Sequence, residues 1–177
     1  MCVIMLPDMQ FSFVARNGEL FSYFRTSQPP VAEADIMSTN KDIKKLFKVD
    51  VRNARYSNEY NCHGLTFISR LGRFAYFNDD VTRLLAAHNY KLIGSALNTD
   101  IDEITVSSKI VRGDVIVYTD GISVQHTGIV WSVKKTGLKY KIKILSKWGD
   151  LSEYFHDYNV VPPSYGKTVQ IWTDRKV

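Results

Sequence analysis

One cysteine in the interior of the chain, Cys62, lies where a thiol can act as a nucleophile. It follows a polar, tyrosine-rich loop, residues 56–61, and precedes an apolar run, residues 65–68, that predicts the first turns of a buried helix. A thiol at a helix N-terminus faces unpaired backbone N–H groups and the positive end of the helix dipole, and both favour the thiolate. The same N–H groups can hold an oxyanion. The alternative for a lone cysteine is a small buried core residue.

A histidine that can accept the thiol proton, His126, follows later in the chain, near the start of a strand expected over residues 124–131. An imidazole within hydrogen-bond reach of a cysteine keeps it ionised and later protonates the leaving amine. We therefore expect folding to bring His126 against Cys62. The alternative is a half-exposed strand histidine with no chemical role.

A third residue is needed to orient the imidazole, and the strand pattern suggests Ser146. From residue 111 onward the alternation predicts an antiparallel meander with strands at residues 115–118, 124–131 and 140–149, and the tail is expected to contain a final strand at residues 168–172. If the second hairpin turns near residues 135–136, His126 lies opposite Leu145 or Ser146. Lys147, His156 or a backbone carbonyl could fill the same role.

The residues around the cysteine supply further candidates. Successive helix residues diverge by about 100°, so we do not expect His63 to be the base and assign it to the substrate groove. Tyr56 and Tyr60 can offer a phenol to an oxyanion. Asn61 and Trp148 complete the set of expected substrate-binding or oxyanion residues.

The N-terminal third is expected to be structural. Residues 11–24 predict a hairpin around a two-residue Asn17-Gly18 turn, with Val14 opposite Phe21. A short amphipathic helix is expected over residues 41–48.

Two further signals mark helix starts. Asn40 or Thr39 is expected to cap the helix over residues 41–48, and Asp79 or Asp80 is expected to cap a helix over residues 81–88.

Three fragments occur in the order found in a known superfamily: residues 61–64 around the cysteine, residues 113–118 with Gly-Asp before a strand, and residues 126–130 with His-x-Gly. The ordered set resembles papain-like cysteine hydrolases, in particular NlpC-type peptidases and amidases of bacterial cell walls. The resemblance covers roughly residues 55–150, and residues 146–166 are similar to a divergent bacterial and phage branch.

This resemblance implies an α+β papain-like fold in which a helix bearing the cysteine packs on an antiparallel β-meander. It implies a single domain over residues 1–177, with an N-terminal hairpin and helix extension over residues 1–50 and a catalytic core over residues 51–177. It also implies Cys62 as nucleophile and His126 as base. The orienting residue of the family is a His, Asn or Gln, so Ser146 departs from the pattern.

The implied function is a cysteine hydrolase that cleaves an amide bond in peptidoglycan stem peptides, with an antibacterial effector or phage lysis factor as its setting. Its partners would be a peptide or peptidoglycan substrate and an immunity or delivery protein. The alternatives are a protein deamidase or acyl-transferase with the same thiol chemistry, and an inactive binding module of the same shape.

Composition limits the other classes. With 177 residues, 45% hydrophobic and 23% charged, the chain suits one soluble domain, and two cysteines make no disulfide framework. The net charge of +5 is scattered apart from a small lysine cluster in residues 41–48, and no nucleic-acid module is expected. No spacing of the kind C-x-x-C or H-x-x-x-H supports a metal site, and no cofactor is expected.

The first residues contain no basic segment and about six apolar residues before Pro7, so we expect no signal peptide and no membrane insertion. On this basis the protein is cytoplasmic in its producer, or exported by a specialised secretion system to a target periplasm.

Overall fold

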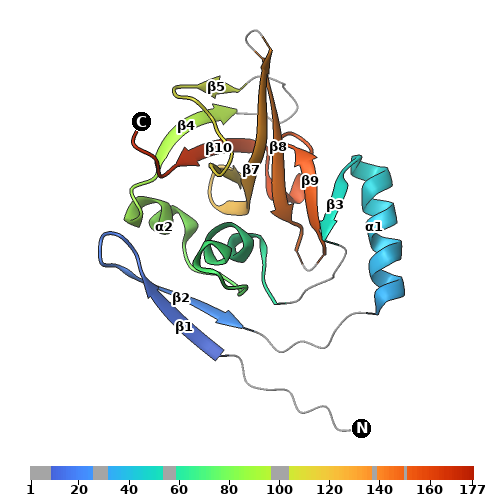
Figure 1. The fold of residues 1–177 in the computed structure, drawn as a ribbon, viewed down its shortest axis with the longest axis horizontal. Coiled ribbons are helices and arrows are strands. Elements are labelled where there is room, and N and C mark those ends of the chain that lie inside the picture. Colours follow the sequence, from blue (N-terminus) through green and yellow to red (C-terminus); the bar gives the residue numbers. More distant parts are fainter. Residues whose placement is uncertain (1–8, 26–31, 54–58, 97–103, 137–138, 150) are drawn as a thin grey trace.

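The structure, a computed structural model, describes residues 9–25, 32–53, 59–96, 104–136, 139–149 and 151–177, and one antiparallel sheet dominates it (Figure 1). The sheet has eight strands in the spatial order β3-β9-β8-β7-β6-β10-β4-β5. Their bounds are β3 Asp50–Asn53, β4 Lys91–Ala96, β5 Thr105–Val106, β6 Val115–Thr119, β7 Val124–Thr136, β8 Lys139–Lys147, β9 Glu153–Asp157 and β10 Thr168–Thr173.

The expected papain-like α+β fold is wrong, because the chain is mostly β. The three strands of the expected meander are present as β6, β7 and β8, and the expected final strand is present as β10, but β3, β4, β5 and β9 double the width of the sheet. β3 and β5 are short and β9 is buried or half-buried at every position, so these strands lack the alternation of a half-exposed strand. β10 pairs between β6 and β4.

The two faces of the sheet carry separate cores. On one, here called the helix face, Val115 and Val117 pack with a β-hairpin, with the helix that starts at Cys62 and with α2 (Val81–Ala87). On the other, the far face, Ile116 and Tyr118 pack with Val130 and Ile144. Successive side chains of β6 therefore alternate between two distinct cores.

The N-terminal hairpin is present as β1 (Met9–Val14) and β2 (Leu20–Arg25), but the expected register is wrong by one residue. Phe13, not Val14, lies opposite Phe21. The turn is longer than two residues, with the Ala15 N–H donating to the Glu19 carbonyl and Gly18 at φ 88°. Because a shift of one residue exchanges the faces of a strand, Phe21 is buried and Val14 is exposed.

The helix expected over residues 41–48 is longer, α1 (Glu33–Phe47), so the expected cap at Asn40 or Thr39 is wrong. The Asn40 side chain instead accepts a hydrogen bond from the Tyr154 hydroxyl at 2.7 Å. The cap of α2 is confirmed: the Asp80 carboxylate accepts from the N–H groups of Thr82 and Arg83. In the described part of the chain, no helix combines the length and apolar character needed to span a bilayer.

Residues 62–71, here called the Cys62 helix, form one continuous helical segment with a π-helical middle, η1 (Gly64–Ile68), and a 3₁₀ end, η2 (Ser69–Leu71). The segment packs on β7 and β8 between α2 and the sheet (Figure 1). A Cβ at Gly64 would lie 1.8 Å from the Ala75 carbonyl oxygen. Only glycine allows this approach, so Gly64 sets how closely the Cys62 helix lies against residues 75–77.

Gly64→Ala is expected to lower the free energy of unfolding by about 1–3 kcal/mol, because the added methyl group overlaps backbone atoms that cannot rotate away. Chemical denaturation measures the loss. Gly94→Ala is the matched control, since its Cβ would meet Thr105 at an ordinary 3.4 Å. Equal stabilities of the two variants would contradict the close approach.

Candidate functional site

The Cys62 thiol lies at the start of its helix and in the wall of an open cavity of about 610 Å³. The side chain is 9% exposed. Around it the cavity is lined by polar and acidic residues and by one exposed loop: Asn61, His63, Asn78, Asp79, Asp80, Val81, Thr82, Ile122, Ser123, Val124 and Gln125. Cys62 is thus a buried residue that borders an open cavity.

The imidazole beside the thiol belongs to His63. Its Nδ1 lies 3.8 Å from the Cys62 Sγ and 2.9 Å from the Thr127 Oγ1. The expectation that His63 would diverge from Cys62 is wrong, because side chains in the first helical turn can fold back toward one another. His63 is therefore the candidate partner of the thiol.

Burial governs the protonation of both groups. It raises the pKa of the Cys62 thiol, while backbone N–H groups of Thr127, His63 and Cys62, and the more distant Lys147 ammonium, act in the opposite direction. Burial also lowers the pKa of His63 to about 4. At neutral pH the resting pair is thus a thiol beside a neutral imidazole.

His126, the expected base, lies on the opposite face of the sheet from Cys62. It pairs with Tyr118, which packs in the far-face core, whereas the neighbouring Thr127 pairs with Val117 on the helix face. Its ring is 0% exposed and stacks on Tyr165 with centroids 4.0 Å apart. Both ring nitrogens lack a hydrogen-bond partner among the described residues. The structure does not bring His126 and Cys62 together.

Ser146 forms a hydrogen bond with a different histidine, His156. The Asp157 carbonyl can only accept, so His156 donates to it from Nδ1 (2.9 Å) and accepts from the Ser146 hydroxyl at Nε2 (2.8 Å). The Ser146 oxygen in turn accepts from the Trp148 indole N–H at 3.0 Å. Ser146 and Trp148 are therefore buried members of a far-face hydrogen-bond chain, away from the cavity.

The register explains why Ser146 does not lie opposite His126. The hairpin pairs Thr136 with Lys139, so it turns later than the expected residues 135–136, and Leu145 lies opposite Ile129. Continued along the strand, this register puts position 148 opposite His126, so the expected position near residues 145–146 is wrong by two or three residues.

Asn61 lines the cavity, but its amide is fully used. The oxygen accepts from the N–H groups of Gly64 and Phe77, and the nitrogen donates to Phe77 O and Asn78 Oδ1. The Asn61 carbonyl also accepts from Leu65 N. Asn61 therefore caps the Cys62 helix and ties its start to residues 77–78.

The Tyr60 hydroxyl does not face the cavity. It donates to Glu153 Oε1 at 2.5 Å, and the other carboxylate oxygen pairs with Arg52 at 2.9 Å. Burial and this carboxylate raise the pKa of Tyr60. Tyr56 lies outside the described residues.

Two threonines that sequence reasoning did not single out complete the site. Thr66 and Thr127 are both fully buried and connect the Cys62 backbone to His63. Thr127 follows His126 directly. The sequence therefore identified the correct strand for the site, but it selected a residue on the face of the sheet opposite Cys62. The order of two neighbouring residues gives no indication of which one faces a helix.

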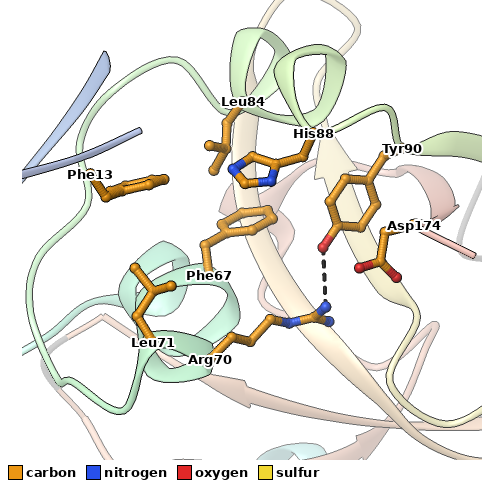
Figure 2. Close-up of a pocket in the computed structure, with 8 residues that line it drawn as sticks. All are labelled: Phe13, Phe67, Arg70, Leu71, Leu84, His88, Tyr90 and Asp174. Atoms are coloured by element: carbon orange, nitrogen blue, oxygen red, sulfur yellow. Dashed lines mark hydrogen bonds between the residues drawn. The ribbon is translucent and has the colours of Figure 1, made fainter. Parts of the chain in front are cut away.

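A second cavity, of about 170 Å³, lies at the other end of the Cys62 helix (Figure 2). Its walls include the aromatic rings of Phe13, Phe67 and Tyr90, and no thiol. Arg70 crosses it to donate to the Tyr90 hydroxyl at 3.1 Å, and also donates to the Gly113 carbonyl at 2.5 Å. These bonds fix the C-terminal end of the helix that carries Cys62.

Within the described ranges, no cluster of three or more His, Cys, Asp or Glu side chains could hold a metal ion. Comparison of the chain with protein-family models, with curated proteins and with solved structures finds no match. The site is therefore interpreted from its own geometry.

His126→Phe is expected to keep or raise the free energy of unfolding, by up to about 1–3 kcal/mol, since it removes two buried nitrogens without partners and keeps the ring stack. The alkylation rate of Cys62 should not change. His156→Phe is the matched control and should lose stability, because both of its nitrogens are bonded. Loss of thiol reactivity in His126→Phe alone would restore His126 as the base.

Ser146→Ala is expected to cost about 1–3 kcal/mol of unfolding free energy, because His156 Nε2 and the Trp148 N–H both lose a buried partner. Iodoacetamide alkylation of Cys62 should be unaffected. Ser132→Ala, at an exposed position of β7, should change stability by less than about 0.5 kcal/mol. A stable Ser146→Ala protein with a slower thiol would show a chemical role.

Proposed function

We propose that the protein is a cysteine hydrolase that cleaves an amide bond with Cys62 as nucleophile and His63 as its imidazole partner. The observation that carries the proposal is the Sγ–Nδ1 contact of 3.8 Å in the wall of an open cavity. A cysteine gains nucleophilic strength from an adjacent imidazole, and a cavity of this size admits a peptide segment.

In the proposed reaction the thiol proton passes to the imidazole, and Sγ attacks the amide carbon. The backbone N–H groups at the start of the helix, which lie close to Sγ, stabilise the negative oxygen. The C–N bond breaks, the amine leaves with the proton from the imidazole, and a thioester remains. Water then hydrolyses the thioester, which releases the acid and restores the thiol.

Peptidoglycan stem peptides are the proposed substrate. They contain amide bonds between small, polar residues, and the cavity offers polar and acidic walls in Asn78, Asp79 and Gln125. An enzyme with this substrate has to reach the cell wall, so we propose export from its producer.

The raised pKa of the thiol favours one alternative, a binding protein in which Cys62 is a buried structural residue. The pH profile of alkylation separates the two. A working thiol reacts faster as pH rises and loses reactivity in His63→Gln, while a structural thiol is slow at every pH and indifferent to residue 63.

The hydrolase is tested in a Cys2→Ser background, where Cys62 is the remaining cysteine. Cell-wall sacculi and a panel of peptide amides are incubated with this protein and with its Cys62→Ala, His63→Gln and His126→Phe variants. Cys62→Ala should release no fragments, His63→Gln should lower kcat by about 10²–10⁴-fold, and His126→Phe should match the parent.

Mass spectrometry of the products identifies the acceptor. New peptide termini indicate hydrolysis, whereas a deamidated side chain or a crosslink indicates a protein deamidase or acyl-transferase with the same thioester. Equal product from the parent and from Cys62→Ala on every substrate would refute thiol catalysis.

A further inference from the structure

Three hydrogen bonds join the Cys62 carbonyl, Thr66, Thr127 and His63. Their chemistry determines which atom of each pair carries the proton. Thr66 Oγ1 lies 2.9 Å from the Cys62 carbonyl oxygen. A carbonyl oxygen can only accept, so the Thr66 hydroxyl proton is directed to it. Thr66 can then only accept from its remaining neighbour.

That neighbour is Thr127, whose hydroxyl donates to Thr66 Oγ1 at 3.0 Å. A hydroxyl carries one proton, so Thr127 has none to offer to His63. The 2.9 Å contact between Thr127 Oγ1 and His63 Nδ1 is therefore a hydrogen bond in which the imidazole donates. With three protons and three contacts, every other arrangement leaves two lone pairs facing each other in a buried site.

The second ring nitrogen of His63, Nε2, is available to accept a proton. His63 Nε2 makes no hydrogen bond among the described residues, because both contacts of the ring involve Nδ1. His63 is neutral at pH 7, since burial lowers its pKa to about 4, so one nitrogen carries a proton and the other a lone pair.

We infer that Thr66 and Thr127 are positioning residues that hold His63 with its proton on Nδ1, where it is donated to Thr127, so that the imidazole accepts a proton at Nε2. This inference rests on the proposed function for its catalytic meaning. The Cys62 carbonyl orients the Thr66 hydroxyl, Thr66 orients the Thr127 hydroxyl, and Thr127 fixes the tautomer of His63.

The consequence is a defined proton route. On ionisation of Cys62 the S–H bond breaks and the proton moves through water in the cavity to Nε2, while the Nδ1 proton stays in its hydrogen bond to Thr127. The products are a thiolate and an imidazolium, and no other group changes charge. When the C–N bond of the substrate breaks, the Nε2 proton moves to the leaving amine.

Nitrogen NMR of the ¹⁵N-labelled protein at pH 7 tests the tautomer directly. The chain has four histidines, and the His63 signals are identified by their loss in His63→Gln. We expect a protonated-type shift for Nδ1 and an unprotonated-type shift for Nε2. The reverse pattern in the parent protein overturns the inference whether or not any variant folds.

Thr66→Val and Thr66→Ser form the matched pair. Valine removes the acceptor of Thr127, whose hydroxyl is then free to donate to Nδ1, so the proton should move to Nε2 and the two shifts should exchange. Serine keeps the hydroxyl and should keep the parent pattern. Identical spectra for the two variants would overturn the inference.

Activity separates this inference from the proposed function. With a cleaved substrate in hand, Thr66→Val should lower kcat by about tenfold or more with KM unchanged, and Thr66→Ser should retain both. Exchange of the shifts without any activity in the parent protein would uphold the hydrogen-bond assignment and reject the hydrolase.

Discussion

The alternation of side chains across the central sheet decides which residues can meet the thiol. Along β7, Thr127 faces the Cys62 helix and His126 faces the core on the other side. Since strand side chains alternate strictly, no rotamer change moves His126 past the backbone of its own strand. The imidazole available to Cys62 is therefore His63, and the contribution of β7 to the site is a hydroxyl.

The start of the Cys62 helix depends on a second constraint, a close approach of backbone to backbone. Gly64 lets the helix lie against residue 75, and the Asn61 amide joins the first turn to residues 77–78 with all of its hydrogen-bonding atoms. Arg70 fixes the other end. Because the Cys62 helix is held at both ends, Cys62 keeps its position relative to β7. The hydrogen bonds between the helix and Thr127 depend on that fixed position.

Short sequence patterns were sufficient to predict structure that depends on neighbouring residues. The Asp80 cap, the strands β6 to β8 and the hairpin could be predicted, because each depends on neighbours in the chain. The width of the sheet, the hairpin register and the face of His126 could not, because they depend on bulges, on turn length and on pairing with distant strands. The sequence identified Cys62 as the nucleophile candidate but assigned the wrong imidazole and the wrong partner for Ser146.

The protonation state of Cys62 and His63 at rest follows from the free energy needed to bury a single charge. Burial disfavours both the thiolate of Cys62 and the imidazolium of His63, so the pair is neutral at rest. Formed together, the two charges would attract by about 4 kcal/mol at a separation near 4 Å and an effective dielectric constant of 20. This attraction offsets much of the desolvation that each charge suffers alone. With His63 in the inferred tautomer, ionisation of the thiol is therefore coupled to protonation of Nε2.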